Sequence, residues 1–336
     1  MSVLIICEKP SVAKTVALAL GAAEQKDGYL SGNGLLVSWC IGHLISMADA
    51  GSYDERYKKW RYEDLPILPQ AWKYAPTPGK EKQLAILKEL LHRSDVSEVV
   101  NGCDAGREGE LIFRFVYEQA GCTKPFSRLW ISSMEDSAIR EGFAGRRAGT
   151  EYDALYQSAL CRARADWLVG INATRLFSVL YHKTLNVGRV LSPTLNLLVE
   201  RDGKITMFHK EKYHIVHIGC GGVDAESERI SDAAAADALR TACEASQAVC
   251  VSLKKEKKTA LPPKLFDLTL LQREANRVYG FTAKQTLDYA QSLYEKRFLT
   301  YPRTDSNYLT EDMAQTATDL VAALLPVLPF MQGAEL

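Results

Sequence analysis

The chain has 336 residues, enough for two or three domains with a sizeable core. Its 41 basic and 41 acidic side chains cancel, which excludes attachment to nucleic acid by bulk charge alone but allows a local basic groove. The apolar opening run is too short for a signal peptide, no stretch approaches membrane-spanning length, and the eight cysteines form no CxxC pair. These features predict a cytoplasmic protein with reduced thiols.

Residues 1–150 alternate strand and helix patterns. Because the strand-like runs are apolar throughout, they predict a mostly parallel sheet with helices on both faces, an α/β domain. Ser11 is expected to cap the first helix and Gly21 to end it. The strands are expected at 2–7, 35–44, 97–103 and 128–133, and the helices at 12–21, 81–92, 111–121 and after residue 133.

From residue 151 the pattern is mainly helical. One long helix is expected over 151–182, and a loop and a second helix follow it. Residues 213–258 differ, because two strand-like runs, 213–222 and 247–258, flank an alanine-rich helix. Helices return at 268–280 and 283–298. The chain is therefore divided into four parts, 1–150, 151–211, 212–262 and 263–336.

An acidic turn, Asp104–Glu110, separates an apolar strand from a helix, and Glu8 ends another strand in the same way. Carboxyl ends of neighbouring parallel strands meet in a crevice, so Glu8, Asp104 and Glu108 could hold a hard cation such as Mg²⁺. The alternative is that these acids only stabilise the first turn of a helix. That alternative explains Glu108 and Glu110 well but explains Glu8 and Asp104 poorly, since both sit at strand ends.

Two further segments carry residues that suit phosphate chemistry. In the segment 300–306, a phenol at Tyr301 could attack a phosphodiester and Arg303 could hold phosphate oxygens, although a simple turn is the simpler interpretation. In the segment 186–194, Gly188 and Arg189 precede a helix start that could bind an anion.

A local basic excess surrounds the second of these segments. The range from Leu160 to Lys212 contains nine Lys and Arg residues and four Asp and Glu residues, an excess of five positive charges.

Six motifs occur in order along the chain, and together they resemble type IA DNA topoisomerases, of the topoisomerase III kind. The motifs are EKPS at 8–11, GHL at 42–44, DAGREGELIFR at 104–114, ADWLVGINATR at 165–175, GRVLSPTL at 188–195 and LTYPRTDS at 299–306. The resemblance implies an α/β Toprim domain followed by mainly helical domains with a small β-containing segment.

The resemblance also implies roles for individual residues. Glu8, Asp104 and Glu108 would bind Mg²⁺, and Tyr301 would form a covalent link to the 5′-phosphate of a cut single strand. Arg303 would steady that phosphate, and Lys9 would support the acid that protonates the leaving oxygen. The residues implied to contact single-stranded DNA are Arg61, Arg162, Asp166, Arg175, Asn186, Val187, Gly188, Arg189, Val190 and Leu191.

The implied activity is ATP-independent cleavage of one DNA strand, passage of another strand, and religation. A helicase or a single-strand-binding protein is an expected partner, and a monomer is the expected state. Two rival hypotheses are a catalytically impaired single-strand-binding remnant and a Toprim phosphotransfer enzyme of the primase or nuclease kind. The second rival is disfavoured, because a Toprim domain alone needs neither of the segments 188–195 and 299–306.

The chain departs from the family pattern at three points. Gly106 stands where the acidic motif has its second aspartate, which should weaken a second metal site more than the first. Leu191 stands where the family often has glutamine. Family members also continue beyond the tyrosine, so the chain is expected to be an N-terminal portion of such an enzyme, or the product of a truncated gene, and to lack a later pocket histidine.

Overall fold

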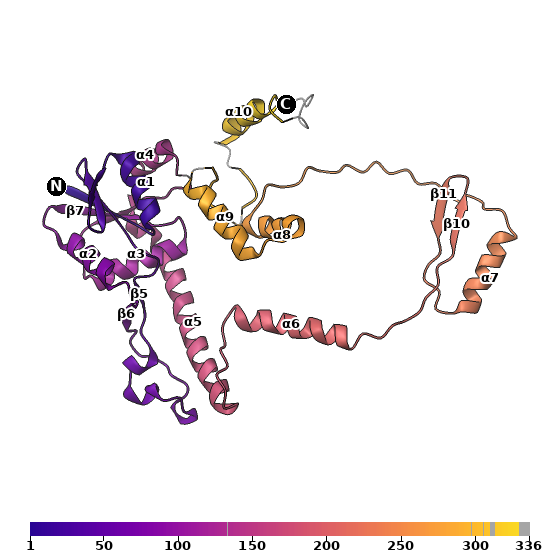
Figure 1. Ribbon diagram of the computed structural model, residues 1–336, viewed down its shortest axis with the longest axis horizontal. Helices are drawn as coiled ribbons and strands as arrows, with labels where there is room; N and C mark the ends of the chain where they lie inside the picture. The colour runs from indigo at the N-terminus through magenta and orange to yellow at the C-terminus, as the bar shows by residue number, and fades with distance from the viewer. Residues whose placement is uncertain (133, 297, 305, 310–312, 329–336) are drawn as a thin grey trace. The chain divides into compact units, whose positions relative to one another are not determined.

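The computed structural model of the chain describes residues 1–132, 134–296, 298–304, 306–309 and 313–328. The chain divides into two units, whose helices and strands are labelled in Figure 1. The first joins Met1–Arg189 with Lys264–Leu336, and the second is Val190–Pro263. The four-part division expected from the sequence stays a prediction.

A seven-stranded sheet forms the centre of the first unit, in the order β2-β3-β4-β1-β7-β8-β9. The four central strands β4, β1, β7 and β8 are parallel, and the pairs toward the edges are antiparallel. The prediction of a mostly parallel α/β sheet is confirmed. The bounds are β1 (Ser2–Cys7), β2 (Glu24–Lys26), β3 (Tyr29–Gly32), β4 (Leu35–Trp39), β7 (Val96–Gly102), β8 (Phe126–Arg128) and β9 (Arg147–Ala148).

Helices cover both faces of this sheet because successive strand residues point to opposite sides. Apolar side chains of α2 (Glu81–His92) and α3 (Arg107–Gln119) pack with one face of the sheet. Those of α1 (Pro10–Leu20) and α4 (Asp136–Ala144) pack with the other. This double cover buries the central strands and leaves their carboxyl ends as the natural place for a site.

The long helix expected after residue 151 is α5 (Asp153–Leu180). It packs against an excursion that leaves the sheet body through β5 (Ile45–Met47) and returns through β6 (Tyr74–Pro76). Trp167 of α5 meets two aromatic rings of the excursion, at centroid distances of 5.5 Å each. The excursion itself is made of short 3₁₀ turns, η1 (Ala50–Ser52), η2 (Glu55–Lys58) and η3 (Tyr62–Asp64).

The C-terminal part of the first unit contains α8 (Leu268–Tyr279), α9 (Ala283–Glu295) and α10 (Ala314–Leu324). A reciprocal capping box between Thr282 and Gln285 begins α9, and Gly280, at φ +70°, ends α8. The segment that carries Tyr301 follows α9.

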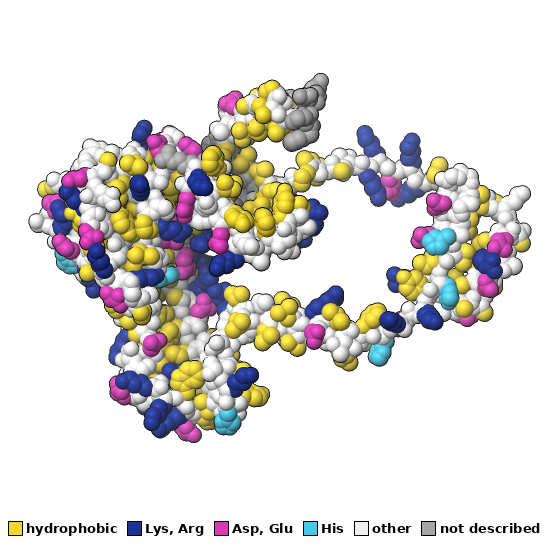
Figure 2. Space-filling model, viewed as in Figure 1, with side chains coloured by type: hydrophobic (Ala, Val, Ile, Leu, Met, Phe, Trp, Pro, Cys, Tyr) yellow, Lys and Arg dark blue, Asp and Glu magenta, His cyan; other side chains and the backbone are white. Residues whose placement is uncertain are grey.

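The second unit contains α6 (Leu191–Thr206), the hairpin β10 (His217–Cys220) and β11 (Val223–Glu226), and α7 (Ala233–Glu244). α6 has no buried residue, and hydrophobic side chains stand along it in Figure 2. The alanine-rich helix is confirmed as α7, which Asp232 caps by accepting from the backbone N–H groups of Ala234 and Ala235.

Three local predictions were wrong. Residues 247–258 form no strand, because β10 pairs only with β11 and no described strand offers them a ladder. The strand predicted over 128–133 ends at Arg128, because the bond from the Leu129 N–H to the Asn101 carbonyl is the last backbone hydrogen bond between the described residues of this run and β7; residue 133 lies outside the described residues. Ser11 is not the cap of α1: Pro10, with its fixed φ, already occupies the first helical position after Lys9.

Among the described residues, no helix combines the length and the apolar character that crossing a membrane requires.

Candidate active site

Two strand ends bring the first two acids together. β1 and β7 are parallel neighbours in which Cys7 pairs with Gly102, so the residues that follow each strand emerge at the same edge. Glu8 is only 7% exposed. Burial raises the pKa of its carboxyl, as does the negative charge of Asp104, while the charges of Lys9 and Arg303 lower it. Two carboxylates and two cations therefore lie close together, whereas the strand ends predicted that three carboxylates would converge.

Glu110, the last acid of the turn, is a structural residue. Its side chain is fully buried and accepts from Asn101 Nδ2 at 2.8 Å and from Arg114 Nε at 2.9 Å. Arg128 Nε forms an ion pair with it at 3.2 Å. Burial raises the pKa of the Glu110 carboxyl, and the two guanidinium groups oppose that rise. These partners tie the start of α3 to β7 and β8.

The backbone of the turn is held on both sides. Arg128 donates to the carbonyl oxygens of Cys103 and Asp104, each at 2.7 Å. On the other side α3 approaches so closely that a Cβ at Gly109 would lie 2.2 Å from the Asp104 carbonyl oxygen. Only glycine fits there, which explains why a glycine separates Glu108 from Glu110.

Glu108 points to a different partner. Its Oε1 lies 2.7 Å from His43 Nε2, and this hydrogen bond is the main cause that lowers the pKa of the Glu108 carboxyl. Lys80 Nζ fixes the loop that carries His43 by donating to the carbonyl oxygens of Ile41 and His43. No group of three His, Cys, Asp or Glu suited to a metal ion occurs within the described ranges. Glu8 and Asp104 are thus brought together, whereas Glu108 faces His43.

Tyr301 reaches the same spot from the far end of the chain. Its backbone N–H donates to the Ser132 carbonyl at 3.2 Å, and its hydroxyl donates to Asp104 Oδ2 at 3.2 Å. Lys9 Nζ lies 3.7 Å from the same oxygen. Burial and then the charge of Asp104 raise the pKa of the Tyr301 phenol, and Arg303 opposes this. The five residues Glu8, Lys9, Asp104, Tyr301 and Arg303 form what we call the tyrosine–acid cluster.

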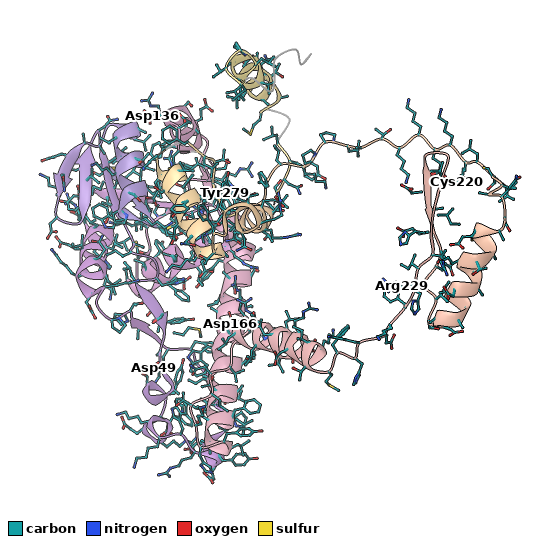
Figure 3. All side chains as sticks on the ribbon, turned by 45° about the vertical axis from the view of Figure 1, so that its right-hand side comes forward. Asp49, Asp136, Asp166, Cys220, Arg229 and Tyr279 are labelled. Carbon is teal, nitrogen blue, oxygen red and sulfur yellow. The ribbon has the colours of Figure 1, made fainter. Side chains whose placement is uncertain are left out.

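Charges on α5 form a second group. Asp166, labelled in Figure 3, pairs with Arg189 Nε at 2.7 Å and with Arg162 Nε at 3.9 Å. Arg162 and Asp166 line a pocket of about 400 Å³ together with His43 and Glu108. This pocket joins the acidic turn to α5, so a ligand lying in it would meet both. We call Arg162, Asp166 and Arg189 the α5 charge group.

Arg175 and Arg61 lie farther along α5 and the excursion. Arg175 is buried, donates to the Tyr57 carbonyl at 2.8 Å, and places its guanidinium 5.4 Å from the Trp60 ring. Burial lowers the pKa of this guanidinium. Arg175 and Trp60 line a second pocket, of about 740 Å³, and Arg61 beside Trp60 is exposed.

The loop after α5 is anchored to that helix at Val187. The backbone N–H of Val187 donates to Thr174 Oγ1 at 2.9 Å. Asn186 and Arg189 are exposed on either side of it, with the half-buried Gly188 between. Val190 and Leu191 are exposed and begin the second unit, where their role stays a prediction.

His43 and Arg128 were not among the predicted site residues. His43 belongs to the GHL motif, and its place one loop after a buried strand was a signal that could have found it. Arg128 carried no signal, because an arginine that ends a strand is ordinarily a solvent-exposed residue. Its burial follows from Glu110, which supplies the opposite charge.

Comparisons with known proteins agree with this arrangement. A family model described as the Toprim domain matches residues 3–134, so the α/β body with its acidic strand ends is of the Toprim class. A model described as DNA topoisomerase matches residues 150–327, over half of the chain. The chain therefore belongs to the DNA topoisomerase family, and the resemblance drawn from the six motifs is confirmed.

Individual relatives point the same way. The chain is 42% identical over 335 residues to a DNA topoisomerase 3 of Shouchella clausii, and 41% identical over 337 residues to one of Bacillus subtilis. These alignments cover 97% and 98% of this chain but 46% of each relative. The solved structure of full-length topoisomerase I from Thermotoga maritima matches with a TM-score of 0.68 at 26% identity, covering 96% of this chain and 52% of that one. The chain thus spans about half the length of the curated relatives it matches.

Proposed function

We propose that this chain carries the strand-cleaving site of an ATP-independent type IA DNA topoisomerase, which cuts one DNA strand, lets another pass, and religates the cut. One observation supports this proposal above the others. The Tyr301 hydroxyl lies 3.2 Å from Asp104 Oδ2, although the two residues are 197 positions apart in the chain. A fold that brings a phenol to a carboxylate beside a lysine and an arginine suits attack on a phosphodiester.

The proposed cleavage step transfers a phosphoryl group from the DNA 3′-oxygen to Tyr301. The Tyr301 oxygen attacks phosphorus and forms the 5′-phosphotyrosyl bond while the bond from phosphorus to the 3′-oxygen breaks. The phenol proton passes to Asp104 Oδ2, toward which it already points. The leaving oxygen takes a proton from Glu8, whose raised pKa favours the protonated form, and Arg303 stabilises the charge on the phosphate. Religation is the reverse of this step.

Oxygen donors at Asp104, joined by Glu8 when that carboxyl is ionised, fit a bound Mg²⁺, because this ion takes one or two carboxylates and completes its shell with water and phosphate oxygens. Burial is the main cause that raises the pKa of the Glu8 carboxyl, and the negative charge of Asp104 adds to it; a cation would offset that second contribution. When bound, the ion would supply positive charge at the phosphate. Glu108 Oε1 is hydrogen-bonded to His43 Nε2 at 2.7 Å, so only the other oxygen of Glu108 could join the ion while that bond is kept.

Single-stranded DNA is the proposed substrate, and the α5 charge group its proposed contact surface. Arg189 and Arg162 share a single carboxylate, Asp166, so a phosphate could replace that carboxylate as the partner of either arginine. The roles of Arg61, Arg175 and residues 186–191 are proposed on the same grounds. A helicase or single-strand-binding partner, a monomeric state and a cytoplasmic location stay predictions.

The test is formation of the covalent adduct. A labelled single-stranded oligonucleotide is incubated with the protein and Mg²⁺, trapped with detergent, and resolved by denaturing electrophoresis. The wild type should yield an adduct, and Tyr301→Phe should yield none while binding the oligonucleotide with unchanged affinity. Tyr308→Phe, on an exposed tyrosine of the same segment, is the matched control. An adduct that persists in Tyr301→Phe contradicts the proposed nucleophile.

A further inference from the structure

A second tyrosine lies directly against the candidate nucleophile. The rings of Tyr294 and Tyr301 meet edge to face, with centroids 5.6 Å apart and an interplanar angle of 70°. Tyr294 is 2% exposed, whereas Tyr301 is half-buried. The ring of Tyr294 is therefore the more deeply buried of the two.

The position of Tyr294 on α9 explains its burial. The buried residues of α9 are Thr286, Ala290 and Tyr294, spaced four apart, so they lie on one face of the helix. Tyr294 packs in the same hydrophobic cluster as Ile5 and Cys7 of β1. The side chain thus joins α9 to the strand that ends at Glu8.

Two other restraints act on Tyr301, and neither determines the plane of its ring. The bond from its backbone N–H to the Ser132 carbonyl holds the main chain. The bond from its hydroxyl to Asp104 holds only the tip, and this bond must break when the hydroxyl attacks. The ring itself packs against the hydrophobic cluster to which Tyr294 belongs, and without that packing it would be free to rotate about its two side-chain torsions at the moment of reaction.

We propose that Tyr294 is a positioning residue, whose ring edge holds the Tyr301 ring in the orientation that aims its hydroxyl at the scissile phosphate. The inference rests on the proposed role of Tyr301 as nucleophile. The orientation of the Tyr301 hydroxyl toward the phosphate matters because a small misplacement of a reacting atom lowers the reaction rate steeply. The contact on which the proposal rests is the one between the two rings.

The first experiment separates the orientation of the Tyr301 hydroxyl from the affinity for the oligonucleotide. Tyr294→Leu keeps an apolar side chain but removes the ring, and Tyr294→Phe keeps the ring without the hydroxyl. We expect Tyr294→Leu to slow adduct formation at saturating oligonucleotide by about tenfold, the upper range for one edge-to-face contact. The dissociation constant should change by less than about twofold, since no phosphate contact is lost. Tyr294→Phe should form adduct at the wild-type rate.

A matched control addresses general destabilisation. Tyr156→Leu makes the same change at a tyrosine that is 5% exposed and packs in the other hydrophobic cluster. Circular dichroism gives the folded fraction of each variant. With equal folded fractions, Tyr156→Leu should form adduct at the wild-type rate. A wild-type rate in Tyr294→Leu would overturn the proposal, and so would an equal loss in Tyr294→Phe, which would assign the effect to the hydroxyl.

A second experiment does not depend on activity. Fluorotyrosine is placed at position 301, and its ¹⁹F resonance is recorded in three backgrounds: the otherwise unchanged chain, Tyr294→Leu and Tyr294→Phe. A resonance that broadens or shifts only in Tyr294→Leu supports a ring held by Tyr294, and identical spectra overturn it. If the wild type forms no adduct, the proposed function fails, while the ¹⁹F result still decides whether Tyr294 restrains Tyr301.

Discussion

The acidic turn and the α5 charge group both pair carboxylates with arginines, but they do so in different surroundings. In the turn, Glu110 and Arg128 are fully buried, and Glu110 has three partners. In the α5 charge group, the side chains of Asp166 and Arg189 remain open to solvent, at 39% and 52% exposure. When one partner of a buried ion pair is removed, the other charge stays buried without compensation, which strongly destabilises the fold. An exposed charge can instead exchange its partner for water or phosphate.

This difference indicates that the two groups of charges have different roles within the first unit. The buried network holds Asp104 in place through the backbone, so the position of a reacting group does not depend on an exposed ion pair. The exposed pairs on α5 can be exchanged during binding at small cost.

The largest effect is expected from Glu110→Gln. The change leaves Arg128 as a buried guanidinium without its carboxylate, which should lower the free energy of unfolding by about 3–5 kcal/mol. Urea unfolding monitored by circular dichroism measures this. Glu89→Gln, on the exposed side of α2, should change it by less than about 0.5 kcal/mol. Equal effects of the two changes would remove the contrast between buried and exposed charges.

Arg189→Ala should act on binding rather than on stability. If the α5 charge group contacts phosphates, affinity for single-stranded DNA should fall by about fivefold, and the slope of log K against log salt should fall by about 0.7. Fluorescence anisotropy between low and high salt provides both values. Arg240→Ala is the matched control, because Arg240 is an exposed arginine paired with two acids on α7. A slope that Arg189→Ala leaves unaltered would contradict the assigned surface.

Gly106→Asp should strengthen metal binding. A Cβ at Gly106 meets no atom within 4 Å, and its φ of 177° suits any residue, so the carboxylate that the family pattern has there can be accommodated. We expect Mg²⁺ affinity, measured by isothermal titration calorimetry, to rise by about threefold, since an added carboxylate favours a hard cation. Gly106→Ala fills the same space without a charge and should bind Mg²⁺ as the wild type does. If Mg²⁺ affinity rose in both variants, the cause would be a stiffer backbone at position 106 rather than the added carboxylate.

The smallest effect concerns Glu98, on β7. The hydrogen bond from Arg146 is the main cause that lowers the pKa of this carboxyl, and Ser127 adds to it. A lowered folded-state pKa stabilises the fold above the unfolded value of about 4.3, and this stabilisation is lost as pH falls through the folded pKa. Glu98→Gln should therefore lower the free energy of unfolding by a few tenths of a kcal/mol at pH 7, and this loss should shrink as pH falls through the folded pKa. Urea unfolding at a series of falling pH values tests this; a difference that stays constant over the series would exclude ionisation as its cause.

Much of the first unit could be predicted from local patterns. The apolar strands, the glycine that ends α1 and the leucine face of α2 appear where periodicity indicated, because each depends on neighbours within one or two turns. The run 247–258 shows the limit of this reasoning. Alternating apolar residues describe a strand only when another strand is present to pair with it, and pairing is not a local property.

The sequence by itself determined the chemistry available to this protein: acids at two strand ends, a tyrosine beside an arginine, and motifs that resemble one family. Tertiary structure alone decided which of these groups meet. The packing of α9 on the sheet brings Tyr301 to Asp104, and the loop held by Lys80 brings His43 to Glu108. Tertiary structure also gives Glu110 a structural role. Its carboxylate is buried among Asn101, Arg114 and Arg128, so it has strong partners and no access to a ligand. Spacing along a chain cannot reveal such contacts, since their energies depend on distance and desolvation in three dimensions.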